Sequence, residues 1–344
     1  MYLGPPGLAC PIGLGAAAAC AALRAGVAGF EELPFHGRSR RPIIAARVPG
    51  VDLRQPRDGR LVDLLALALT DFLATAPELR AKDVPLLVGL AEPGRPGGAD
   101  RLLPRIIPEV QAKLGVEFHP DQTRAIPEGH TAAFAALHVA RDLLQSPDVP
   151  ACVVCAVDSF VNPVSLTWLD DTWRLKREGH SNGVIPGEAA AAILVTRDPP
   201  ANGVAVRVAG LGFGREDAHV LSDRPLLGFG LAEAARAALA EANVRMRDIH
   251  LRLSDVTGEA YGFKEQALSL SRLMREGPSD LPVWHWADAI GDCGAAAGVC
   301  MLAFARHAFL GSYAPGTRAM CYTSAVRGDR AVAVLERQLL RSVE

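Results

Sequence analysis

The stretch IPEGHTAAFAALHVARDLL, residues 126–144, places a histidine where a helix is predicted to begin. A Pro-Glu-Gly turn precedes His130, and the residues after it have the apolar spacing of an amphipathic helix. An imidazole ionises near neutral pH and can act as an acid or a base in catalysis. The role of His130 therefore decides whether this chain is an enzyme.

Cysteine is the second residue type that could do chemistry here. The chain has 7 cysteines, and Cys152 and Cys155 form a C-x-x-C within ACVVCAV, a run typical of a buried strand. Residues three apart on a strand point to opposite faces, so this spacing argues against a redox pair or a shared metal. Cysteines scattered through apolar runs predict that the protein is located in the reducing cytoplasm.

The composition predicts a large core and argues against nucleic acid as the main partner. Of the 344 residues, 49% are apolar and 6% are aromatic, and the formal net charge is -2. No basic excess is available to neutralise phosphates. The N-terminus lacks the basic start of a signal peptide, and no uncharged run reaches the roughly 18 residues of a membrane span.

Short apolar runs alternate with Ala-rich helical stretches, a pattern typical of an α/β fold. A Pro-, Gly- and Asn-rich linker at 196–203 predicts two units, 1–198 and 203–344. The segments 36–60 and 91–101 are predicted to be exposed loops. The predicted strands are 85–91, 151–157, 189–197, 204–214, 249–256 and 330–337, and the predicted helices are 15–25, 61–75, 104–113, 130–144, 231–242, 263–275 and 294–308.

The segment 158–195 carries the most information about the fold. In it Gly183, Gly187 and Glu188 lead into the apolar run AAAAILV, as a G-x-x-x-G-E-G-A motif does before a strand. This segment resembles the β-ketoacyl synthases of the thiolase superfamily. Other similar segments follow in the family's order: 11–30, 129–140, 254–268 and 288–302. The resemblance implies a thiolase-like fold, with two similar βα halves in alternating helix and sheet layers, usually as a dimer.

The catalytic residues of that family are replaced in this chain. Alignment of ALHVA with A-L-H-L-A assigns the nucleophilic cysteine to His130, and the two histidine motifs fall on Asp255 and Asp292. The Gly-rich loop that completes the oxyanion hole is replaced by CYTSAVRGDR, 321–330. Loss of the thiol, the imidazoles and the loop predicts a chain that does not condense acyl groups. Cys293 stands beside Asp292, whose carboxylate weakens a thiol nucleophile, so it is predicted to be a core thiol.

If the three side chains converge as in the family, His130 lies between two carboxylates, and three interpretations stay open. The group is a structural plug, a hydrolytic or acid–base site with His130 as base, or a metal site for a hard divalent ion. Sequence spacing cannot separate them, because the residues come from different segments. Glu188 is predicted to be an ion-pair partner inside the fold, and His138 a histidine of the core.

The leading functional prediction is a non-condensing, thiolase-fold pseudoenzyme without a cofactor, acting in the bacterial cytoplasm as a binding, adaptor or assembly protein. Its partner would be a ketosynthase, as for chain-length factors, an acyl carrier protein or a secretion effector. The alternative is an acyl or thioester hydrolase, or an acyltransferase, that uses His130, Asp255 and Asp292. The resemblance also implies a homodimer whose sheet continues through the strand at 151–157.

Overall fold

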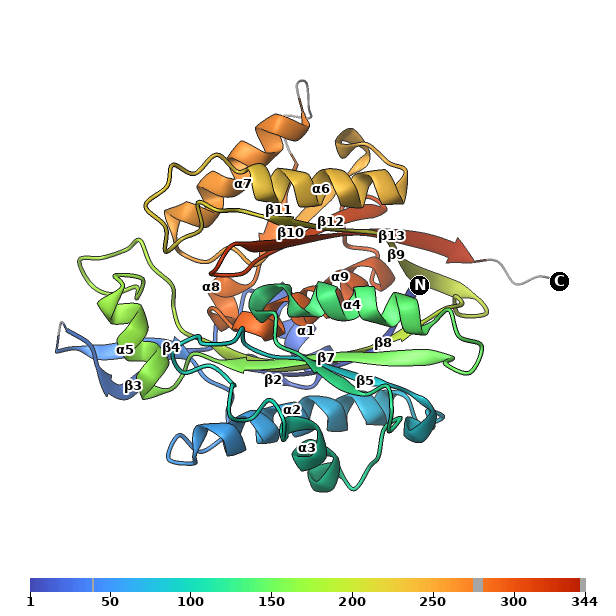
Figure 1. Cartoon of the computed structure of the whole chain (residues 1–344), viewed down its shortest axis with the longest axis horizontal. Coiled ribbons are helices and arrows are strands. Elements are labelled where there is room, and N and C mark those ends of the chain that lie inside the picture. Colours follow the sequence, from blue (N-terminus) through green and yellow to red (C-terminus); the bar gives the residue numbers. More distant parts are fainter. Residues whose placement is uncertain (39, 275–280, 341–344) are drawn as a thin grey trace.

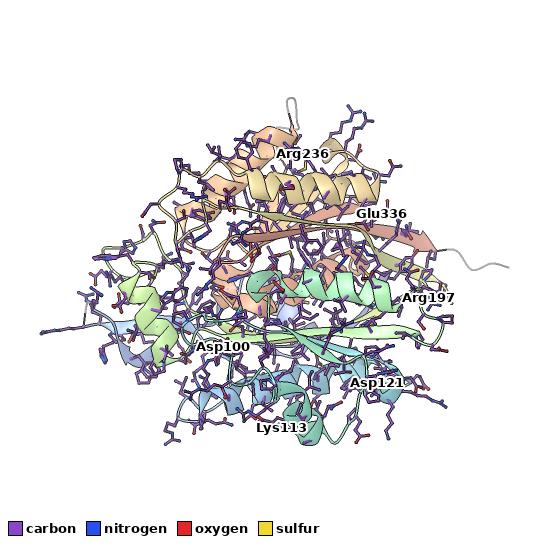
Figure 2. All side chains as sticks on the ribbon, viewed as in Figure 1. Asp100, Lys113, Asp121, Arg197, Arg236 and Glu336 are labelled. Carbon is purple, nitrogen blue, oxygen red and sulfur yellow. The ribbon has the colours of Figure 1, made fainter. Side chains whose placement is uncertain are left out.

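The computed structural model describes residues 1–38, 40–274 and 281–340. An outer helical layer, one half of the main sheet, a central helical layer, the other half of that sheet and another outer helical layer follow one another through the molecule (Figure 1). Charged side chains such as Lys113 and Arg236 project from the two opposite outer layers (Figure 2). Each half of the chain therefore places its strands between helices.

The first half of the chain builds one end of the sheet. Its strands are β1 (Tyr2–Cys10), β5 (Leu86–Gly89), β6 (Arg124–Ile126), β7 (Ala151–Ser159) and β8 (Glu188–Thr196). Their order is β1-β8-β7-β5-β6, where β8 is antiparallel to both neighbours and β7, β5 and β6 are parallel. Every residue of β7 is buried, as expected for a strand covered on both faces.

The second half repeats this arrangement. Its strands are β9 (Gly203–Arg215), β10 (Leu251–Ser254), β11 (Val283–His285), β12 (Arg318–Ser324) and β13 (Asp329–Leu340). Their order is β9-β13-β12-β10-β11. As β8 does in the first half, β13 runs antiparallel to both of its neighbours, and β12, β10 and β11 are parallel. The predicted thiolase-like class, with two similar βα halves, is confirmed. The boundaries 1–198 and 203–344 remain a proposal, which the positions of β8 and β9 support.

Helices cover both outer faces and separate the two halves of the sheet (Figure 1). α2 and α3 cover the first half, α6 and α7 cover the second, and α1, α4 and α9 lie between them. The prediction that the helix after His130 is buried between sheets is confirmed, because α4 contacts β5, β7 and β13. Across the described ranges, no helix is both long and apolar enough to cross a membrane. The helices are α1 (Ala16–Arg24), α2 (Arg57–Thr75), α3 (Ile106–Leu114), α4 (Ala132–Leu143), α5 (Pro163–Asp171), α6 (Phe229–Ala242), α7 (Ala260–Leu273), α8 (Ala287–Ile290) and α9 (Ala297–Leu310).

Two segments predicted as exposed loops contain ordered or buried parts. β4 (Pro42–Ala46) lies within 36–60 and pairs with β3 (Phe30–His36). Outside these two segments, the short strand β2 (Gly13–Leu14) pairs with β1. Within 91–101, Glu92 and Arg95 are buried. The loop prediction is wrong at these points because apolar residues of β4 and an ion pair of Arg95 take part in the interior.

Strand β7 lies inside the sheet. It pairs with β8 along its whole length and with β5 through Val153–Ala156. The prediction that a dimer continues the sheet through 151–157 is wrong, because both edges of this strand are bonded to strands of the same chain. Within the described sheet, β6 and β11 are the strands at the two ends.

Candidate functional site

The candidate site lies where α4 and α9 begin next to each other in the central layer. Short 3-10 turns precede the two helices, η2 (Gly129–Thr131) and η4 (Gly294–Ala296), and these turns contact each other. The two helices occupy equivalent positions in the repeated topology, since each follows the outermost parallel strand of its half. Their close approach requires Gly298, where a Cβ would lie 2.5 Å from the Cβ of Ala133.

His130 and Asp292 meet at this junction. Nε2 of His130 lies 2.9 Å from Oδ1 of Asp292, and the two residues are 4% and 5% exposed. The backbone N–H of Gly294 donates to the same Oδ1 over 3.0 Å. The main chain of Asp292 is hydrogen-bonded to that of Ile185 and Gly187, which holds the carboxylate against His130.

The surrounding charges keep His130 protonated. Burial alone lowers the pKa of His130, but the carboxylates of Asp292, Asp255 and Glu92 outweigh it and raise the pKa to about 9. Burial likewise raises the pKa of Asp292, but pairing with His130 outweighs it and lowers the pKa to about 2. At neutral pH the two side chains therefore form an imidazolium–carboxylate ion pair.

Asp255 follows β10 and borders the same cleft, but it is held differently. Its Oδ2 accepts the backbone N–H of Ser324 over 2.7 Å. In the part of the chain that the structure describes, no hydrogen bond joins Asp255 to His130. Burial raises the pKa of Asp255 to about 6, and the positive charge of His130 limits the rise. The structure thus brings together a His130–Asp292 pair with Asp255 as a neighbouring charge.

Three charged residues beside this pair, Glu92, Arg95 and Arg174, were not predicted from the sequence as site residues. Arg95 forms a buried ion pair with Asp158, and Arg174 donates to both oxygens of Glu259 over 2.8 and 2.7 Å. Glu92 is 7% exposed, and neither carboxylate oxygen has a hydrogen-bond partner among the described residues. The signal that could have found Glu92 and Arg95 is their place directly after the predicted strand at 85–91, where side chains of parallel strands converge on a site.

A small cleft opens beside His130. Its volume is about 60 Å³, and its lining includes His130, Asp255, Asp292, Arg174 and Arg330. This space admits a few water molecules but no acyl chain. Nδ1 of His130 is buried without a hydrogen-bond partner in the described structure. The described residues also contain no group of three His, Cys, Asp or Glu side chains placed to hold a metal ion.

The other predicted residues lie at different depths. The Cys293 thiol is buried, and the neighbouring Cys300 together with burial raises its pKa. Glu188 is fully buried and accepts two hydrogen bonds from Nη2 of Arg60, at 2.8 and 2.6 Å. His138 lies on an exposed face of α4, so its prediction as a core histidine is wrong. The sheets leave that face of the helix uncovered, which the apolar spacing alone did not reveal.

No family model and no curated protein matches this sequence. Solved structures do match in fold. The oxazolomycin ketosynthase domain of Streptomyces albus JA3453 is 15% identical, with a TM-score of 0.76 over 99% of this chain and 75% of that chain. The ketosynthase from module 6 of the bacillaene synthase of Bacillus subtilis 168 is 14% identical, with a TM-score of 0.77 over 98% and 72%. A ketosynthase in complex with its chain length factor from Xenorhabdus doucetiae is 16% identical, with a TM-score of 0.72 over 97% of each chain. The chain therefore has the thiolase-like fold of ketosynthases, and fold alone does not assign an activity.

Proposed function

We propose that this protein does not condense acyl groups and instead acts by binding, as a chain-length-factor-like subunit, an adaptor or an assembly protein. The observation that carries the proposal is the buried His130–Asp292 ion pair where α4 and α9 begin. The resemblance assigns the nucleophilic cysteine to the position of His130 and a catalytic histidine to that of Asp292. An ion pair in place of the thiol and the imidazole leaves no nucleophile to carry an acyl group.

The same ion pair argues against the alternative of a hydrolase that uses His130 as its base. A general base must be unprotonated at the working pH, and a pKa of about 9 keeps His130 protonated at neutral pH. The cleft of about 60 Å³ is also small beside the roughly 300–1,000 Å³ of typical ligand pockets. Cys293 does not replace the nucleophile, because its thiol is buried and the neighbouring Cys300, together with burial, raises its pKa.

The purified protein is expected to stay unacylated when it is incubated with acetyl-CoA or malonyl-CoA, as measured by intact-mass spectrometry beside an active ketosynthase. The His130→Cys variant is also expected to stay unacylated, because the facing carboxylate of Asp292 raises the pKa of a thiol at that position. An acyl adduct on the parent protein that disappears in His130→Ala would contradict the proposed function.

The proposed partner is a second thiolase-fold chain. Solved structures of the same fold include a ketosynthase with its chain length factor and a type II ketosynthase with an acyl carrier protein. In the described residues β6 pairs on one side only, with β5, so its outer edge has backbone groups available to another strand. We infer that this edge, and not β7, is where a second copy continues the sheet.

A dimer is expected in light scattering at micromolar concentration. The Ala125→Pro variant removes a backbone N–H from β6 and is expected to be monomeric. Ala125→Ser keeps that N–H and serves as the matched control, which stays dimeric. A monomeric parent protein, or a dimer that tolerates Ala125→Pro in a folded chain, contradicts the inference about β6.

A further inference from the structure

A second cavity lies apart from the His130 cleft and shares no lining residue with it. This aromatic cavity, defined by the walls Trp284, Trp286, Phe304 and Tyr313, has a volume of about 410 Å³. It lies between the end of α1 and the segment from β11 to α8. Its volume falls within the roughly 300–1,000 Å³ typical of small-molecule sites.

The walls of the aromatic cavity suit a flat ring system. Trp284 is stacked on Tyr313 with an interplanar angle of 24°, and Trp286 lies tilted against Phe304 with ring centroids 5.7 Å apart. Aromatic side chains attract other rings through stacked and edge-on contacts as well as through the area they bury. Cys20 and Leu253 add apolar surface to the same walls.

Two polar groups at the aromatic cavity make no hydrogen bond to the described residues. The guanidinium of Arg24 lies 4.5 Å from the ring centroid of Tyr313, and no carboxylate of the described residues pairs with it. Nδ1 of His285 is buried without a hydrogen bond, 3.7 Å from the nearest oxygen of Asp288. The hydroxyl of Tyr313 is hydrogen-bonded to Nδ1 of His307 over 2.8 Å.

We propose that the aromatic cavity binds a small aromatic carboxylate. The ring would lie between the aromatic walls, and the carboxylate would accept hydrogen bonds from the planar guanidinium of Arg24, with His285 as a second polar contact. Asp288 also lines the cavity, and its side chain is 68% exposed, so solvent screens its charge. A single cation opposite one acidic residue favours a monoanion over a phosphate dianion.

The test uses 2-naphthoate as the probe and isothermal titration calorimetry of the full-length protein. Saturable one-to-one binding is expected with a Kd on the order of 0.1 mM. The neutral isostere 2-naphthamide is expected to bind about tenfold more weakly, since it forms no charge-assisted hydrogen bond. In Arg24→Gln the two probes are expected to bind equally. Arg24 is exposed, so this change leaves folding intact, which a thermal melt verifies.

Arg236→Gln is the matched control, because Arg236 is an exposed arginine on α6 in an outer helical layer (Figure 2). It is expected to bind 2-naphthoate as the parent protein does. Quenching of tryptophan fluorescence that persists in the Trp168→Phe/Trp173→Phe variant would locate the probe at Trp284 and Trp286. Absence of saturable binding up to several millimolar overturns the proposal. Equal affinity of the parent for the two probes, or an Arg24→Gln variant with unchanged affinity for 2-naphthoate, overturns it as well.

Discussion

Replacement of His130 by alanine is expected to lower the free energy of unfolding by about 3–5 kcal/mol, the usual cost of removing one partner from a buried ion pair. Asp292 is 5% exposed and would remain as a charge without its cation. The carboxylates of Asp255 and Glu92 add to the repulsion, because both already act on His130. Chemical denaturation at neutral pH measures the loss.

Removal of both charges is expected to recover part of that stability. The double variant His130→Leu/Asp292→Ala removes both members of the pair, and apolar replacement of a whole ion pair is often neutral. Asp255 need not be changed, since Ser324 holds its carboxylate. His138→Ala is the matched control on the same helix, and as an exposed site it is expected to change stability by less than about 0.5 kcal/mol. A His130→Ala variant as stable as the parent would indicate a strained, function-built group in place of a structural pair.

Stability is expected to fall by about 3 kcal/mol as the pH rises from 6.5 to 9 and above, since each pKa unit corresponds to about 1.4 kcal/mol. The pKa of His130 is raised to about 9 from an ordinary 6.5. A histidine whose pKa is raised by folding stabilises the protein fully when the pH is below its pKa in the unfolded chain. This stabilisation is lost as the pH rises through its pKa in the folded protein. The lowered pKa of Asp292, about 2, places the corresponding acid loss below about pH 4.

The measurement is a series of denaturation curves between pH 6 and pH 9.5 for the parent protein and for His130→Gln. Glutamine has no charge to lose, so the variant is expected to show a much smaller change over this range. In the parent protein Asp255 acts at lower pH, because its pKa of about 6 makes stability decrease as the pH rises from about 4 to 6. Equal slopes for parent and variant above pH 6.5 would show that His130 is not the titrating group.

Both experiments bear on the proposed function. A protonated, hydrogen-bonded His130 stabilises the junction of α4 and α9 and is not available as a base. If His130 instead proved neutral at pH 7 and dispensable for stability, the hydrolase alternative would gain the base that it needs.

The amino-acid sequence by itself determined the local elements and their class. The fully apolar run ACVVCAV predicted the buried strand β7, and the spacing after His130 predicted α4, because burial on both sides shows in a short segment. The order of the segments that resemble the ketosynthase family was enough to predict the two thiolase-like halves. His130 at a helix start was visible for the same reason, since a turn and the helix after it are neighbours in the chain.

Only the tertiary structure decided which of these elements meet. His130 and Asp292 are 162 positions apart, and their contact depends on the order of strands in two halves of a sheet, to which no local pattern refers. The same dependence hid the burial of Arg95, since its ion-pair partner Asp158 comes from a distant segment of the chain. The tertiary structure also placed β7 inside the sheet and left His138 exposed. Segments distant in the sequence decide whether a strand edge or a helix face is covered.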